Sequence, residues 1–187
     1  MKNALFALLL LGGLLTACSK ENALPEEQPQ IQNRNPLDER GTDEPFCTTA
    51  TVNLIAGQHI NAGNIEILQD EQFIYVTYNT TDGWVLAKTH LYVGGCAAIP
   101  VNGAGNPQPG RFPYKAAHSN VTSYTYAVPI AAIGIGNCGC IAAHAEVKKL
   151  NASGSVIQQE TAWGEGSAIN PSGSWAMKFE FCPVACP

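Results

Sequence analysis

Two segments of alternating apolar and polar residues each place histidine on their polar side. In residues 84–93 His90 falls opposite the apolar positions, and in residues 140–148 His144 and Glu146 do so. If the two segments are neighbouring strands, these three side chains form a polar patch that can bind a metal ion or an acidic ligand. Two unrelated surface histidines are the alternative, and we predict no resident metal or cofactor. The apolar positions of the first segment are Val85, Ala87, Thr89, Leu91 and Val93, which leaves Trp84, Leu86, Lys88, His90 and Tyr92 on the other side.

Three glutamates near the ends of expected strands are the candidates for hydrolysis: Glu146, Glu160 and Glu165. A glycoside-acting enzyme needs two carboxyl groups about 5–10 Å apart in a cleft. The chain has no Gly-x-Ser-x-Gly, His-Glu-x-x-His, phosphate-binding or dinucleotide-binding motif. Hydrolysis by these carboxylates is therefore the alternative hypothesis for the function, and we name no catalytic residue.

Trp84 and Trp163 are the candidates for ligand binding by an aromatic ring. Each stands at the end of an expected strand beside a glycine, Gly83 or Gly164. An indole exposed at such a position stacks on a sugar ring, whereas packing in the core or at its rim is the other role of a tryptophan. Alternating Trp175, Met177, Phe179 and Phe181 are expected to pack in the core. The candidate ligand-binding residues are Trp84, Trp163, His90, His144 and Glu146.

Seven cysteines divide into one near the start of the chain and six in the later part. Removing Cys18 leaves an even number in a chain with the export signal described below, so three disulfides are expected. Cys138 and Cys140 are too close along a strand to pair with each other. We expect Cys96 to pair with Cys138, and Cys47 and Cys140 to pair with the two C-terminal cysteines. The six are Cys47, Cys96, Cys138, Cys140, Cys182 and Cys186, and a zinc site made from the last four is the alternative.

Short alternating runs separated by Gly, Asn, Asp and Pro predict the elements that carry these residues. No helical period is present, and the spacing of the runs is typical of a sandwich. We predict an all-β fold, an antiparallel β-sandwich of about eight strands stapled by disulfides, with a β-barrel as the alternative. Two Gly- and Pro-rich connections, residues 94–113 and 164–174, interrupt the pattern, and the longer is expected to be functional or to cross between sheets. The expected strands are 48–56, 64–68, 73–79, 84–93, 123–130, 140–150, 155–163 and 175–182.

The first 17 residues have the pattern of a secretory signal peptide, with Lys2 followed by an apolar run over residues 4–15. A run of 12 residues is too short for a membrane-spanning helix, which needs about 20. The following Leu15-Thr16-Ala17-Cys18 resembles a bacterial lipobox. That resemblance implies cleavage before Cys18 and acylation of this residue, here written as palmitate, and two or more acyl chains give lasting membrane attachment. Ser19 after the cysteine implies the outer membrane, with display at the cell surface as one outcome.

Residues 18–45 are expected to form a tether between the lipid and a folded domain over residues 46–187. The tether is rich in proline and charge and has few apolar residues, so it cannot form a core. The whole chain has a net charge of −5 and only 10 basic residues. It therefore lacks the basic face that sequence-independent binding of nucleic acid requires, and we predict no nucleic-acid partner.

Six stretches resemble an uncharacterised domain of exported proteins of the Bacteroidota. They are residues 75–84, 89–94, 105–114, 142–146, 160–165 and 173–176. The resemblance implies a bacterial lipoprotein with an exported domain, and it brings no activity, substrate or site residue with it. We therefore expect a lipid-anchored binding or interaction module of the cell envelope, with a glycan or a protein as its partner, rather than an enzyme.

Overall fold

The computed structural model describes Leu37 and residues 46–187. The predicted signal peptide over residues 1–17, the lipidated Cys18 and the tether through residue 45 therefore lie outside the described residues, apart from Leu37.

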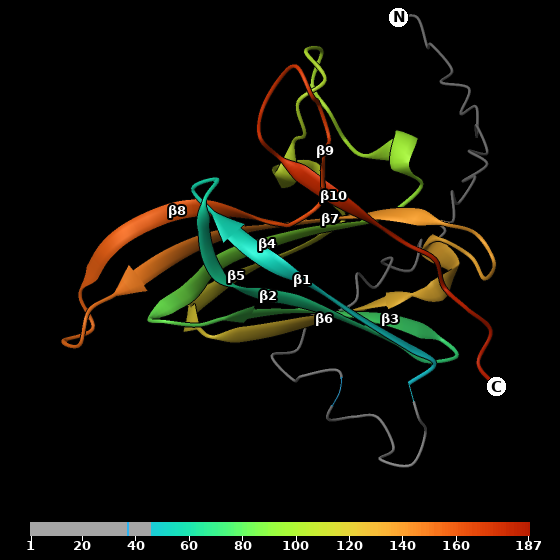
Figure 1. The fold of residues 1–187 in the computed structure, drawn as a ribbon, viewed down its shortest axis with the longest axis horizontal. Helices are drawn as coiled ribbons and strands as arrows, with labels where there is room; N and C mark the ends of the chain where they lie inside the picture. Colours follow the sequence, from blue (N-terminus) through green and yellow to red (C-terminus); the bar gives the residue numbers. More distant parts are fainter. Residues whose placement is uncertain (1–36, 38–45) are drawn as a thin grey trace, which may run out of the picture. The chain divides into compact units, whose positions relative to one another are not determined.

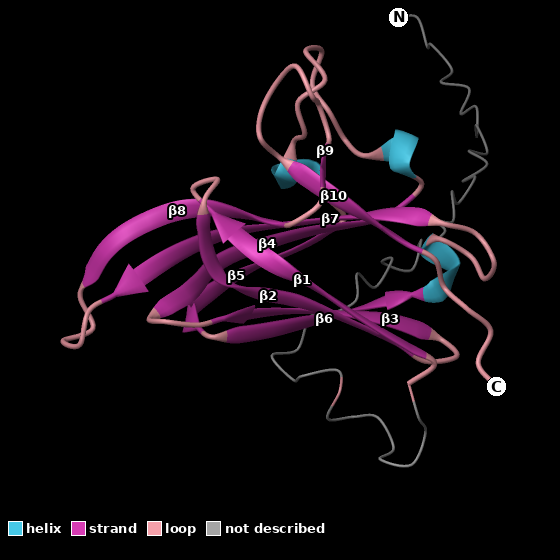
Figure 2. Cartoon of the chain, in the orientation of Figure 1, coloured by secondary structure: helices cyan, strands magenta, loops and turns pink. Residues whose placement is uncertain are grey.

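Strands make up most of the described chain, and the only helices in it are three one-turn 3-10 segments (Figure 2). The all-β prediction is confirmed, and each of the eight expected strands overlaps an observed one. The structure adds two strands that the pattern did not predict, β5 and β9. The elements are β1 (Thr48–Ala56), β2 (Ile60–Gln69), β3 (Phe73–Thr80), β4 (Trp84–Gly94), η1 (Cys96–Ala98), η2 (Pro109–Arg111), β5 (Tyr114–Val121), β6 (Ser123–Pro129), η3 (Ile130–Ala132), β7 (Gly139–Leu150), β8 (Val156–Gly164), β9 (Ser167–Ala168) and β10 (Met177–Phe181).

The strands form one antiparallel order, β5-β4-β7-β8-β1-β2-β3-β6, with β10 paired to the start of β7 (Figure 1). The strands at the two ends of this order contact each other through side chains. The ring of Tyr114 on β5 lies 6.0 Å from that of Tyr126 on β6, and His118 lies 4.4 Å from Tyr124. The sheet is therefore continuous and almost closed, so the barrel alternative describes it better than two separate sheets.

The inner face of this sheet encloses the main core, and strand β4 reaches it with a break in its alternation. Leu86 pairs with Val147 and Lys88 with Glu146, so Ala87 is an extra residue, a β-bulge. Before the bulge the even-numbered residues Trp84 and Leu86 are buried in the core. After it, the odd-numbered residues from Thr89 onward face the core instead. The prediction that Ala87 faces the core and Leu86 the other side was wrong, because strict alternation does not account for an inserted residue.

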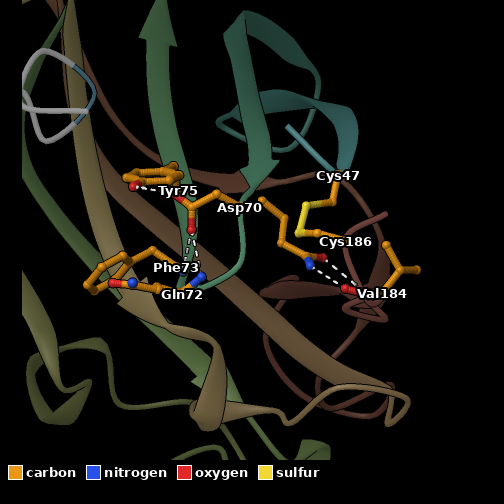
Figure 3. Close-up of a disulfide and its surroundings, with 8 residues drawn as sticks. Cys47, Asp70, Gln72, Phe73, Tyr75, Val184 and Cys186 are labelled. Carbon is orange, nitrogen blue, oxygen red and sulfur yellow. Dashed lines mark hydrogen bonds between the residues drawn. A yellow bond between two sulfur atoms is a disulfide. The ribbon is translucent and has the colours of Figure 1, made fainter. Parts of the chain in front are cut away.

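One disulfide, Cys47–Cys186, joins the residue before β1 to the end of the chain (Figure 3). Beside it the buried side chain of Gln69 donates to the carbonyl of Val184 at 2.6 Å and accepts from the Val184 amide at 3.1 Å. In the next turn Asp70 accepts hydrogen bonds from the Phe73 amide and the Tyr75 hydroxyl. The side chain of Gln69 thus holds the C-terminal segment by two hydrogen bonds to the backbone of Val184, in place of a neighbouring strand.

The other two disulfides are Cys96–Cys140 and Cys138–Cys182. Six paired cysteines are confirmed, and so is the pairing of Cys47 with a C-terminal cysteine. The expected Cys96–Cys138 pair was wrong, and so was the expected pairing of Cys140 with a C-terminal cysteine. Phe181 pairs with Gly139 in the β10–β7 register, which places Cys182 opposite Cys138 and leaves Cys140 for Cys96. The zinc alternative is also wrong, because all four of its cysteines are in disulfides.

Candidate functional site

The two predicted histidines lie side by side on the outer face of the sheet, the face opposite the main core. Strands β4 and β7 are neighbours, and their register pairs His90 with His144. The two Nδ1 atoms are 3.1 Å apart. Glu146, the third member of the predicted patch, is two register pairs further along and forms an ion pair with Lys88 at 3.1 Å. The structure therefore brings His90, His144 and Glu146 onto one face, as their strand positions predict.

Burial keeps the histidine pair neutral. The side chain of His144 is only 6% exposed, and its ring packs 4.8 Å from that of Trp163. Burial, and to a smaller extent His90, lower the pKa of His144 to about 3. Burial also lowers the pKa of His90, where the charge of Glu146 acts in the opposite sense and Lys88 and Lys115 act in the same sense. At neutral pH one ring donates a hydrogen bond and the other accepts it.

Neither of the predicted tryptophans offers a ring to solvent. Trp84 is 1% exposed in the main core, with the Lys149 ammonium 5.5 Å from its ring centroid. Trp163 is 5% exposed and packs between His144 and Phe112. The hypothesis of sugar stacking by Trp84 or Trp163 is therefore wrong for this structure, since both rings are covered by protein.

The three predicted carboxylates diverge. Glu146 lies on the outer face, whereas Glu160 pairs with Val147, a residue of the inner face. Glu160 accepts a hydrogen bond from Gln158, and Glu165 accepts one from Asn53 on β1. Glu146 and Glu160 face opposite sides of the sheet, and all three carboxylates have separate partners, so the geometry gives no support to a catalytic pair drawn from them.

A third histidine belongs to the interior. His118 Nε2 is 2.8 Å from the Thr89 hydroxyl, which is 2.7 Å from the hydroxyl of Tyr126. Burial lowers the pKa of His118 and raises that of Tyr126. This chain of hydrogen bonds satisfies polar groups where β5 approaches β6, and it contributes to closing the sheet.

A second hydrophobic cluster lies on the outer face, beside the histidine pair. It is covered by the two long connections, residues 95–113 and residues 165–176, which we call the loop platform (Figure 1). The Cys96–Cys140 disulfide fastens the first connection to β7. A small hydrophobic cluster of this kind, packed beneath long loops, helps to hold the loops in one conformation. The cluster consists of Tyr92, Ile99, Phe112, Cys140, Ala142, Trp163 and Ala176, with Ile169, Trp175 and Met177 packed against it.

Two asparagines lock the connections of the loop platform to each other. Asn170 donates to the carbonyl of Ala104 at 2.8 Å and to the side-chain oxygen of Asn106 at 3.1 Å. That oxygen of Asn106 also accepts from the Ser174 amide at 2.8 Å. A Cβ on Gly173 would overlap the side chains of Asn106 and Asn170, so a larger residue there would displace this hydrogen-bonded pair. The platform is thus a built structure in which residues far apart in sequence meet.

Sequence reasoning missed the residues that shape this platform. Asn106 and Asn170 stand in Gly- and Pro-rich stretches with no periodicity. Trp175, expected in the core, is only partly buried and packs against the second cluster. The sequence feature that could have indicated these residues is the length of the two Gly- and Pro-rich connections, which the sequence analysis noted as interruptions of the strand pattern.

Comparison with protein families, curated proteins and solved structures finds no match to this chain. Within the residues that the structure describes, no helix is long and apolar enough to span a membrane.

Proposed function

We propose that this protein is a lipid-anchored binding module of a bacterial cell envelope, attached to the outer membrane through Cys18. Two features support the proposal. The first is the signal peptide and lipobox pattern that ends at Cys18. The second is the presence of three disulfides among the described residues, which is typical of exported proteins.

The single observation that carries the binding role is the loop platform. Binding sites are disproportionately formed by loops held on a rigid scaffold. Here the scaffold is the sheet, the Cys96–Cys140 disulfide fixes one loop, and the Asn106–Asn170 hydrogen bond fixes the other to it. Order in long loops costs conformational entropy, and this structure offsets that cost with a dedicated hydrophobic cluster.

The composition of the loop platform indicates the chemistry of its partner. Residues 95–110 and 166–175 contain no charged side chain, and the charged residues of the loop platform, Arg111 and Glu165, stand near its ends. Exposed Asn102 and Ser172 offer amide and hydroxyl groups, and Trp175 offers a partly exposed ring. A neutral glycan, which is bound by aromatic stacking and hydrogen bonds, fits this surface better than a charged protein surface does.

Retention on a glycan array tests this proposal. The full chain is compared with Trp175→Ala and with Trp84→Phe, a matched change of a tryptophan in the main core. Loss of one stacked ring costs about 1 kcal/mol, so we expect Trp175→Ala to weaken retention about five-fold or more. Trp84→Phe should leave retention unchanged.

The melting temperature of each variant serves as the folding control. Retention that is equal in Trp175→Ala and the parent chain contradicts a role for the platform. If no glycan is retained by the folded parent chain, the glycan part of the proposal is wrong and a protein partner takes its place.

A further inference from the structure

We propose that His90 and His144 bind one divalent late transition-metal ion, Cu²⁺ or Zn²⁺, through their Nδ1 atoms. This inference is independent of the loop platform and of the lipid anchor. It rests on the position of two imidazoles on adjacent strands.

The distance between the two nitrogens is the first argument. Imidazole nitrogens bind such ions at about 2.0–2.1 Å, so two of them lie about 2.9 Å apart at a square-planar corner and about 3.4 Å apart at a tetrahedral one. The observed Nδ1–Nδ1 distance is 3.1 Å. The two Nδ1 atoms therefore need to shift by only a few tenths of an ångström to reach such a separation, and the ring that carries its proton on Nδ1 must carry it on Nε2 when the ion binds.

Rigidity of the pair is the second argument. The β4–β7 register fixes the two backbones opposite each other, and the Tyr78 hydroxyl donates to the carbonyl of His90 at 3.0 Å. Trp163 packs on the ring of His144, which is almost wholly buried. A site whose ligands are already in place loses little entropy when the ion binds.

The charges around the pair come from three side chains. Glu146 lies next to His144 on the same face, and it forms an ion pair with Lys88 in which both side chains are exposed. Lys115 on β5 is paired with His90 in the register. The carboxylate of Glu146 attracts a cation bound to the pair, whereas the ammonium groups of Lys88 and Lys115 oppose it.

The described side chains supply no third ligand to the pair as they stand. Among residues 46–187, no third His, Cys, Asp or Glu joins the two histidines in a group whose ligand atoms all lie within 4.8 Å. Water completes the coordination in such a site, and an open position is what distinguishes metal sites that take a further ligand from closed structural ones. Two imidazoles favour copper, zinc or nickel over calcium or magnesium, which prefer oxygen.

Titration with Cu²⁺ tests the inference. Calorimetry measures the affinity and the number of ions bound, and electron paramagnetic resonance identifies the ligand atoms. All samples are the full chain with Cys18→Ser, so that this thiol does not bind the ion. We expect one high-affinity Cu²⁺ per chain, with nitrogen couplings in the spectrum and at least ten-fold weaker binding in His90→Gln. The matched control is His59→Gln, because His59 is exposed in the β1–β2 turn, and it should bind as the parent does.

A second measurement does not depend on the folding of a variant. Addition of Zn²⁺ to the ¹⁵N-labelled parent chain should shift the Nδ1 resonances of His90 and His144 and leave those of His118 in place. Affinity within two-fold of the parent in folded His90→Gln, or Zn²⁺ shifts at other histidines alone, overturns the inference. Loss of glycan retention in other variants has no bearing on it.

Discussion

His144 shows how packing decides the chemistry of a single residue. Its strand position places it on the outer face, where a histidine is ordinarily solvated, yet Trp163 and the neighbouring loops leave it 6% exposed. Burial in an apolar environment disfavours the charged form, so the ring is neutral across the physiological range. A neutral imidazole retains the lone pair that both a hydrogen bond and a metal ion need.

This burial predicts a specific dependence of stability on pH. The pKa of His144 is about 3 in the folded chain and about 6.5 when unfolded, so between these values the unfolded chain binds more protons. The free energy of unfolding should therefore fall as the pH falls through 6.5, by about 2 kcal/mol between pH 7 and pH 5 from this residue. Urea unfolding with a chelator present measures it.

The matched variants for this measurement are His144→Gln and His59→Gln. The first should lose the part of the fall between pH 7 and pH 5 that His144 contributes, about 2 kcal/mol, because glutamine does not titrate. The second should keep the fall, because His59 is exposed. Equal pH dependence in His144→Gln and the parent chain would contradict the buried, neutral state of this ring.

Sequence pattern predicted the histidine pair but misjudged the tryptophans, for a physical reason. His90, His144 and Glu146 all follow the bulge in β4 or lie on β7, where simple alternation holds. Trp84 precedes the bulge and so turns into the core, and Trp163 is covered by loops whose position no local pattern specifies. Alternation tells which side of a strand a residue faces, and it does not tell what covers that side.

At the scale of elements, the β4 bulge changes which residues are in the core. Ala87 is the inserted residue, and Trp84 and Leu86 are inward because of it. Without the bulge the second half of β4 would turn over, since a shift by one residue moves every side chain to the other face. The bulge therefore lets one strand contribute to the core at both ends and present His90 outward in between.

Two substitutions at adjacent positions test the bulge. Leu86→Ala should lower the free energy of unfolding by about 3 kcal/mol, because Leu86 is fully buried. Ala87→Ser should change it by less than about 0.5 kcal/mol, because Ala87 lies outside the core cluster. Denaturant unfolding of both variants provides the comparison, and a larger effect at Ala87 than at Leu86 would restore strict alternation.

Strand β5 could not be predicted from the alternation of apolar and polar residues. The sequence of β5, YKAAHSNV, has one aromatic and one β-branched residue, so its propensity for a strand is low. It forms because β4 pairs with it and because Tyr114 and His118 pack against β6. Tertiary contacts of this kind decide the structure where local preference is weak.

At the scale of the molecule, disulfides fasten segments that lie outside the main strand order to the sheet. Cys47–Cys186 fastens the C-terminal segment, Cys138–Cys182 joins β10 to β7, and Cys96–Cys140 holds a platform loop. The cysteine count predicted three bridges, whereas the pairing required the register of β10 against β7. Disulfides of this kind are typical of exported proteins.

The lipid anchor is tested by one substitution. Cys18→Ala removes the thiol to which the acyl chains attach, so labelling of the protein with a palmitate analogue should disappear. The protein should then accumulate as an unprocessed precursor or be released from the membrane fraction, since two or more acyl chains are needed for lasting attachment. The control is Ser19→Ala, which should remain labelled, and lipid label that persists in Cys18→Ala would remove the argument for a lipoprotein.

Photo-cross-linking on intact cells tests most directly the central claim that the loop platform is the binding surface. A photoreactive residue is placed at Ser172, exposed on the platform, or at Ser153, exposed in the β7–β8 turn. We expect a discrete cross-linked product from Ser172 and none from Ser153. Products from Ser153 alone, or the same products from both positions, would contradict it.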